Sequence, residues 1–136
     1  MVITGDASVR LYVSSDAPDT DFVVRITDVD GEGNSRKLAD GVLSARYRNG
    51  FDHAEFMEPG EIYQLDIRTT KFSHCFRAGH RIRLTVTSGA KNLIFPNSNT
   101  RDGFNSVEIK TAKNQVHHGG AHASGVWLRV GKEGRR

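Results

Sequence analysis

The chain has 136 residues, one cysteine and a formal net charge of +3 at pH 7. A chain of this length forms one domain and buries about two-thirds of the surface that its unfolded form exposes, so it needs no metal or disulfide to fold. One cysteine excludes an internal disulfide, and no apolar run reaches the ~18–20 residues that a membrane span requires.

The two ends of the chain and the charge pattern bear on location and partners. Residues 1–6 lack the basic and long apolar segments of a signal peptide, which fits a cytoplasmic protein or a segment from the middle of a longer one. The mixed charges do not form the basic stripe with interleaved aromatics that nucleic-acid binding requires. Only residues 129–136 are consistently basic, and we expect residues 131–136 to be a disordered tail after a single domain at residues 1–130.

The first half of the chain predicts strands that are joined by tight turns. Residues 8–14 and 21–29 each alternate in polarity, as half-buried strands do. Their expected inner residues are Val9, Leu11, Val13, Phe22, Val24 and Ile26. Residues 30–34, Asp-Gly-Glu-Gly-Asn, are typical of a hairpin turn because they accept positive φ. A further turn is expected at Asp40-Gly41, before a strand in which Leu43, Ala45 and Tyr47 share one face.

The second half of the chain continues this pattern. Strands are expected at residues 61–69, 81–88, 106–112 and 125–130, with one short helical turn at 73–76. In the strand at 81–88 the residues expected to face the core are Ile82, Leu84 and Val86. About eight short strands with glycine and aspartate turns between them predict an all-β, jelly-roll-like β-sandwich with little helix.

A series of short motifs resembles one family, in that family's order and over nearly the whole chain. The motifs are Ser14–Phe22, Ile26–Gly31, Leu38–Arg48, Glu58–Tyr63, Thr70–Ser88, Asn97–Thr100, Gln115–His118 and His122–Ser124. Together they resemble the C-terminal β-sandwich domain of X-Pro dipeptidyl-peptidase and cocaine-esterase (acyl esterase) type serine hydrolases. The resemblance implies a galactose-binding-domain-like jelly roll. Residues 89–96 and 122–124 depart from the family pattern, so any specificity that those loops contribute is not carried over.

The resemblance also implies a role. In the family, an α/β-hydrolase domain carries a Ser-His-Asp triad, and the sandwich stabilises that domain and helps to wall its substrate pocket. No serine here has the Gly-x-Ser-x-Gly pattern of a nucleophile elbow; the nearest segment, Gly33–Lys37, lacks the last glycine. The chain is therefore expected to be noncatalytic and without cofactor, with the α/β-hydrolase domain as its partner. A homodimer through the face that the parent enzyme would cover is compatible with this role.

Six histidines raise the question of a metal site. His117, His118 and His122 lie within six residues, but ligands on a strand are expected at i and i+2, and adjacent His117 and His118 face opposite ways. We therefore expect no metal. The polar residues expected to hydrogen-bond loop backbone, or to face the hydrolase domain or its pocket, are His74, His80, Asn97, Asn99, His117, His118 and His122.

Other reactive or charged residues have structural interpretations. Cys75 lies between Phe72 and Phe76, so it is expected to be buried and inert. The acidic run lacks the spacing of a calcium loop, so its members are expected to cap turns: Asp16, Asp19, Asp21, Asp28 and Asp30. The strand arginines are expected on a solvated face, with pairing to acidic groups as the alternative: Arg46, Arg48, Arg81 and Arg83.

The alternative function is that of a carbohydrate-binding module or a free-standing ligand-binding sandwich, because carbohydrate-binding modules share the sandwich architecture. These modules bind sugars on an exposed platform of aromatic side chains. The only tryptophan, Trp127, is expected to face outward between Val126 and Leu128, with Tyr12 and Tyr63 as candidate partners in a platform.

Overall fold

The computed structural model describes residues 1–131, and these residues form nine strands and three short 3-10 helices. The strands are β1 (Val2–Gly5), β2 (Ser8–Ser15), β3 (Asp21–Val29), β4 (Ser35–Ser44), β5 (Tyr63–Arg68), β6 (Phe72–Cys75), β7 (Arg81–Thr87), β8 (Asn114–His117) and β9 (Gly125–Trp127). The 3-10 helices are η1 (Ala45–Tyr47), η2 (Gly103–Asn105) and η3 (Gly120–His122). The predicted tail lies, from residue 132 onward, outside the described residues.

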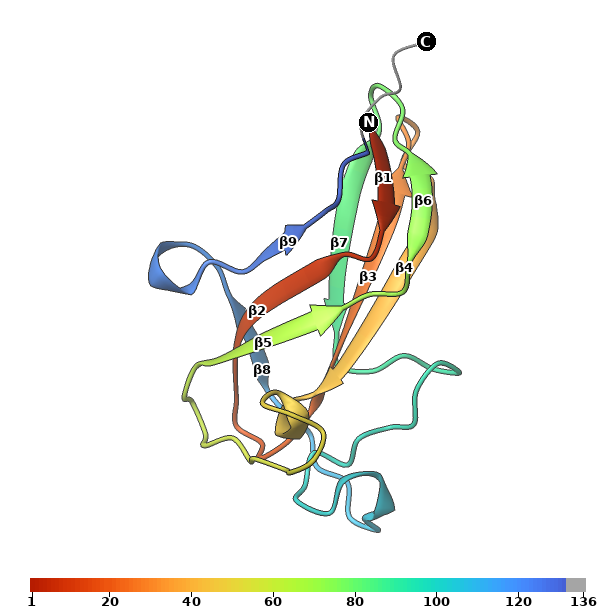
Figure 1. Ribbon diagram of the computed structural model, residues 1–136. Helices are drawn as coiled ribbons and strands as arrows, with labels where there is room; N and C mark the ends of the chain where they lie inside the picture. The colour runs from red at the N-terminus through yellow and green to blue at the C-terminus, as the bar shows by residue number, and fades with distance from the viewer. Residues whose placement is uncertain (132–136) are drawn as a thin grey trace.

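The strands form two main antiparallel sheets and a two-stranded ribbon (Figure 1). One sheet has the order β5-β2-β8, and β9 also pairs with β2, beside the first residues of that strand. The other sheet has the order β4-β3-β7, and β1 pairs with β6 to form the ribbon. The predicted all-β sandwich is confirmed. Among residues 1–131 no helix has the length and apolar character needed to cross a membrane.

The core lies between the two main sheets and follows from period-two alternation. The buried cluster consists of Val9, Leu11, Val13, Phe22, Val24, Leu43, Ala45, Met57, Leu65 and Ile67. On β7, the predicted inner residues Ile82, Leu84 and Val86 are half-buried, while the arginines and threonines between them are exposed. Each buried apolar side chain of this size contributes about 1.5–3 kcal/mol to folding, so the alternating rows dominate the stability.

The predicted turn at Asp40-Gly41 is wrong, because both residues lie inside β4. A β-carbon at position 41 would lie 2.7 Å from the backbone oxygen of Arg68, so the glycine is needed for a close approach between β4 and the end of β5. Asp40 pairs with Arg25 of β3 at 2.7 Å, Oδ1 to Nε. Asp-Gly therefore marks a crossing of two strands here and not a reversal of the chain.

The strand predicted through Tyr47 is also wrong, because η1 replaces it. The backbone amide of Ala45 donates to the Thr20 carbonyl oxygen at 2.9 Å, and the amide of Arg46 donates to Asp19 Oδ1 at 2.9 Å. These bonds from the preceding loop take the donors that a neighbouring strand would otherwise use.

The helical turn predicted at residues 73–76 is wrong, because β6 is a strand that pairs with β1. Strand β1 was not predicted, and its residue Ile3 is fully buried opposite His74. Because His74 faces inward, the next residue faces outward, and Cys75 is exposed and not buried as expected.

The strand predicted at residues 106–112 is absent from the described residues. The next strand is β8, which begins at Asn114 and pairs with β2. Residues 106–112 run over the surface, where Val107 and Ile109 are exposed and the Lys110 amide donates to the Ser98 carbonyl at 2.9 Å. The last predicted strand is shorter than expected: β9 ends at Trp127, and Val130 makes an isolated bridge to Ile3.

Candidate functional site

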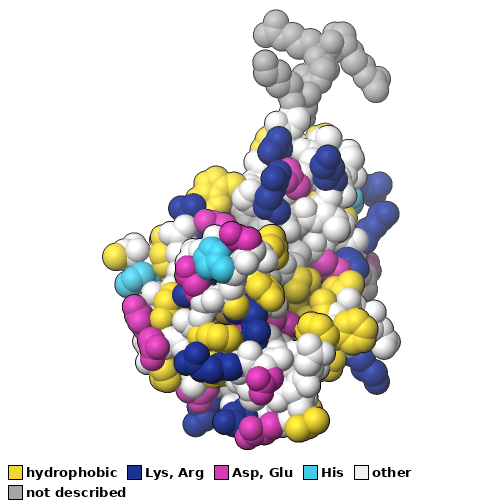
Figure 2. Space-filling model, turned by 60° about the horizontal axis from the view of Figure 1, so that its bottom comes forward, with side chains coloured by type: hydrophobic (Ala, Val, Ile, Leu, Met, Phe, Trp, Pro, Cys, Tyr) yellow, Lys and Arg dark blue, Asp and Glu magenta, His cyan; other side chains and the backbone are white. Residues whose placement is uncertain are grey.

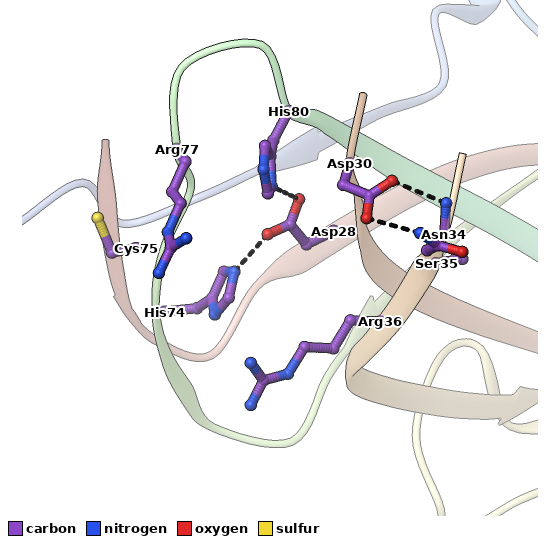
Figure 3. A pocket seen from close by; sticks show the side chains of 9 residues that line it. All are labelled: Asp28, Asp30, Asn34, Ser35, Arg36, His74, Cys75, Arg77 and His80. Carbon is purple, nitrogen blue, oxygen red and sulfur yellow. Dashed lines mark hydrogen bonds and ion pairs between the residues drawn. The ribbon is translucent and has the colours of Figure 1, made fainter. Parts of the chain in front are cut away.

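A buried carboxylate closes the end of the core where the ribbon meets β3. The inward row of Phe22, Val24 and Ile26 continues to Asp28, whose side chain is only 7% exposed. Asp28 Oδ2 lies 2.7 Å from His74 Nε2, and Asp28 Oδ1 lies 2.9 Å from His80 Nδ1 (Figure 3). One carboxylate thus joins three separate segments: β3, β6 and the turn before β7. We call these three residues the histidine clamp.

The histidine clamp forms the floor of a cleft of about 490 Å³. The cleft is lined by Asp28, Asp30, Asn34, Ser35, Arg36, His74, Cys75, Arg77 and His80. In Figure 3 the side chains of Arg36 and Arg77 extend toward His74 from opposite sides. Asp30 acts in the adjoining hairpin turn, where its Oδ1 accepts the amides of Glu32 and Asn34, each at 2.9 Å. Asp30 therefore caps a turn as predicted.

The electrostatics of the clamp favour an ionised carboxylate. The hydrogen bond from His74 lowers the pKa of Asp28, burial opposes this effect, and the hydrogen bond from His80 lowers the pKa further. Within residues 1–131 neither imidazole hydrogen-bonds a serine or cysteine side chain. Both oxygens of the Asp28 carboxylate are occupied by histidine rings, and in the described part of the chain neither ring hydrogen-bonds a nucleophile. The clamp therefore orients the two rings and has no means of acyl transfer.

The opposite end of the sandwich holds a second buried polar group, which we call the aspartate network. Asp19 is fully buried, and its Oδ2 lies 2.7 Å from Arg46 Nε. Asn97 Nδ2 donates to Asp19 Oδ2 and to Asp21 Oδ1, each at 2.8 Å, and Ser44 Oγ donates to Asp21 Oδ1 at 2.6 Å. Asn97 therefore fastens the long loop after β7 to the start of β3.

Three side chains have roles that sequence reasoning missed. Asp19 and Asp21 were expected to cap turns, yet they bind side chains from distant segments. Arg46 was expected on a solvated face, but it is mostly buried against Asp19, so the alternative of acidic pairing is the correct one for this residue. The buried partners of Arg46 come from positions 19 and 100, and no local pattern reports such pairings.

A hollow with an aromatic rim lies beside the aspartate network. Its volume is about 240 Å³, and Tyr47, Phe95 and Phe104 are among its lining residues. Phe95 is 84% exposed, and Phe51, also exposed, packs against Tyr47 with ring centroids 5.9 Å apart. We call Phe51, Phe95 and Phe104 the aromatic rim. Figure 2 looks onto this lower end of the molecule and shows hydrophobic side chains exposed between charged ones.

The remaining predicted polar residues are only partly brought together. His117 Nε2 lies 2.9 Å from Ser14 Oγ, and the rings of His117 and His122 have centroids 6.4 Å apart. His118 follows the end of β8 and is exposed. Asn99 adopts a positive φ of 59° and donates from Nδ2 to the Lys110 carbonyl at 2.7 Å. In the described residues no three histidine, cysteine or acidic side chains are grouped so that they could hold a metal ion.

The three aromatics considered for sugar binding do not share one face. Trp127 lies opposite Ser8 on the outer face of the β5-β2-β9 sheet, and Tyr12 lies on that face too. Tyr63 lies opposite Val13 and packs on the core, with the Arg48 guanidinium carbon 4.3 Å from its ring centroid. Tyr12 and Trp127 therefore share a face, although Trp127 lies opposite Ser8 and Tyr12 packs against His122; Tyr63 is not on that face.

Comparison with known families defines the class of protein. A family model for the X-Pro dipeptidyl-peptidase C-terminal non-catalytic domain matches residues 1–126. The chain therefore belongs to this family of domains, and the resemblance seen in its motifs is confirmed.

Individual relatives are esterases and peptidases. The chain is 37% identical over 131 residues to cocaine esterase of Rhodococcus sp. (strain MB1 Bresler), covering 94% of this chain and 23% of that protein. Its fold matches an aminopeptidase of a marine sediment Thaumarchaeota archaeon, with a TM-score of 0.88 and 24% identity. The match covers 94% of this chain and 23% of the aminopeptidase. It also matches an α-amino acid ester hydrolase, with a TM-score of 0.87 and 22% identity. This match covers 95% of this chain and 24% of the hydrolase. The chain thus spans about a quarter of the length of these relatives.

Proposed function

We propose that this chain is the noncatalytic sandwich domain of a serine hydrolase that acts on X-Pro peptides or on related esters and amides. The observation that carries the proposal is the match of residues 1–126 to a domain described as non-catalytic, in relatives that are about four times longer. In this role the chain stabilises an α/β-hydrolase domain and forms part of the wall of its substrate pocket, and it hydrolyses nothing alone.

The aromatic rim supports a contact with such a partner. Phe95 and Phe104 line one hollow, and Phe51 packs against Tyr47, which also lines it. All three phenylalanines expose large apolar surfaces, and exposed apolar surface of this kind marks interaction sites. The aspartate network beneath the rim holds the loop after β7 against β3, so the rim is presented on a fixed base. Two further apolar residues of the segment between β7 and β8, Val107 and Ile109, are exposed as well.

The first test is activity. Purified chain should not cleave an X-Pro anilide or a short acyl ester, because the sequence has no nucleophile elbow and, among residues 1–131, the rings of the histidine clamp hydrogen-bond no serine or cysteine. The intact gene product should cleave one of these substrates and lose that activity to a serine-directed phosphonate. Cleavage by the isolated chain that the same phosphonate abolishes would contradict the proposal.

The second test concerns the docking role of the aromatic rim. In the intact gene product, replacing Phe95 and Phe104 by alanine should lower the temperature at which esterase or peptidase activity is lost, because the apolar contact with the hydrolase domain is removed. Val42→Ala, which shortens an exposed apolar side chain on β4, is the control. Equal thermal inactivation of the two variants would show that the rim does not dock on the hydrolase domain.

A further inference from the structure

The outer face of the β5-β2-β9 sheet presents an ordered grid of side chains. Opposed residues across the three strands form the rows Arg68–Ser8–Trp127, Asp66–Arg10–Gly125 and Gln64–Tyr12. Part of this face is hollowed to about 410 Å³, and the hollow is lined by Ser8, Arg10, Asp66, Ile67, Arg68 and Trp127. None of these side chains takes part in the histidine clamp, the aspartate network or the aromatic rim.

Trp127 forms a platform in this hollow. Its indole lies over Gly125, where an added β-carbon would be 3.7 Å from the indole atom Cη2. The Arg10 guanidinium carbon lies 5.6 Å from the ring centroid, within cation–π range. These contacts hold the ring in place while Trp127 remains 55% exposed. A fixed, exposed indole offers a flat apolar surface without a further loss of side-chain entropy on binding.

Hydrogen-bonding groups surround the platform and are held in position by one another. Asp66 Oδ1 accepts from Arg10 Nε at 2.8 Å, and Asp66 Oδ2 accepts from Gln64 Nε2 at 3.0 Å. Tyr12 Oη donates to Gln64 Oε1 at 3.2 Å, which extends the chain of bonds along the sheet. Asp66 is 59% exposed, so its remaining lone pairs are open to a ligand.

The charges of this face select a neutral ligand. Arg10 is paired with Asp66, and Arg68 is paired with Asp6, so each guanidinium of the hollow already has a carboxylate partner. Nucleic acid also stacks on tryptophan, but it needs unpaired cations along its phosphates. A proline-rich peptide needs a groove lined by several aromatics, whereas this hollow has one. A polyhydroxylated ring needs one flat apolar surface with fixed donors and acceptors at its edge.

We propose that this face binds a neutral glycan, with one pyranose ring stacked on Trp127 and its hydroxyl groups bonded to Asp66 and Arg10. Tyr12 and Gln64 lie next along the sheet, where they meet the following sugar unit. The inference is independent of the hydrolase role, because it uses a face that the aromatic rim does not share. It also differs from the sequence-based platform in excluding Tyr63 and in adding the polar residues of β2 and β5.

The chain contains one tryptophan, so its fluorescence, when tryptophan is excited selectively over the three tyrosines, reports on this site alone. The probes are hexaoses of glucose, galactose, mannose and xylose, and the corresponding soluble polysaccharides, at up to millimolar concentration. We expect saturable quenching or a blue shift with at least one of them, and protection of Trp127 from acrylamide. No change with any probe would overturn the proposal.

Variants separate stacking from generic loss of an aromatic residue. In affinity gels containing the polysaccharide that binds, Trp127→Ala should abolish retardation, and Asp66→Asn should weaken binding about tenfold. Phe95→Ala, which removes an exposed aromatic from the rim, should leave retardation unchanged. Retardation that persists in Trp127→Ala would overturn the proposal. The same would follow if the intact gene product and its Trp127→Phe variant were quenched equally by acrylamide, because the face would then be covered by another domain.

Discussion

Strand β3 buries an aspartate near each of its ends, and the two ends hold these groups with different partners. At the first end, Asp21 is bound by Ser44 and Asn97, beside the Asp19–Arg46 pair. At the other end, Asp28 is bound by two histidines. Arginine, asparagine and serine keep one charge state across the physiological range. The same strand therefore has one end bound by groups with fixed charges and one end bound by two imidazoles.

The largest effect is expected at the end with fixed charges. Asp19→Asn replaces a buried carboxylate that accepts from the backbone and side chain of Arg46 and from Asn97. Because it leaves a buried guanidinium without a counter-charge, it should lower the free energy of unfolding by about 3–5 kcal/mol. Urea denaturation followed by circular dichroism measures this. Glu108→Gln, which removes an exposed pair with Lys110, should change it by less than about 1 kcal/mol, and equal losses would contradict the expectation.

A smaller effect is expected from breaking the histidine clamp. Asp28→Asn keeps the shape of the side chain but offers an amide group where one imidazole nitrogen donates, so the β1–β6 ribbon should loosen from β3. The urea midpoint should fall, by less than in Asp19→Asn, and ribbon amides such as that of Phe76 should exchange faster with solvent. His53→Gln, at an exposed site bonded to Asp52 and Glu55, is the matched control. Unchanged exchange in the ribbon would mean that the clamp does not hold it.

The stability difference between the wild type and Asp28→Asn should itself depend on pH. The histidine bonds lower the pKa of Asp28 in the folded chain relative to the unfolded one. The stabilisation is therefore complete above the ordinary aspartate pKa of about 4 and is lost as pH falls through the lower folded value. Unfolding free energies measured from pH 6 down to about pH 2 should converge for the two proteins. A gap that stays constant over this range would rule out the lowered pKa.

The smallest effect is expected at the aromatic rim of the isolated chain. Phe95→Ala and Phe104→Ala remove exposed side chains with little core contact, so each should change the free energy of unfolding by no more than about 0.5 kcal/mol. The measurement is the same urea titration. A loss of several kcal/mol would show that these rings belong to the core of this domain and not to a docking surface.

Local alternation was enough to predict most of the sandwich. The inner rows of β2, β3 and β7 were predicted from alternation, and on β7 burial follows that alternation. Strand β3, at the centre of its sheet, is buried on both faces. The turn at Asp40-Gly41 was predicted wrongly because the same dipeptide occurs both in chain reversals and where two strands approach closely. Only the position of the Arg68 backbone distinguishes the two cases. Strand β1 is short and its alternation is weak, so its identity depends on pairing with β6, about 70 residues away.

The functional surfaces were less predictable than the fold. His74 and His80 were selected as polar corner residues, but their shared partner Asp28 was assigned to turn capping. Trp127 was selected as outward-facing, yet Arg10, Asp66 and Gln64 join it only through strand register. Such groups depend on which strands become neighbours, and one sequence does not report this. The cytoplasmic location and the homodimer stay predictions.

The pairing of β2 has a consequence for synthesis of the chain on the ribosome. Its residues 8–15 emerge early, and one edge of the strand is covered by β5 from the middle of the chain. Among residues 1–131, the other edge is covered only by β8 and β9, which lie at residues 114–127. Until those residues leave the ribosome, the nascent sandwich has an unpaired strand edge, which is the feature that promotes association between chains. Premature stops before residue 114 should therefore yield products that aggregate, even though most of the core residues have already been made.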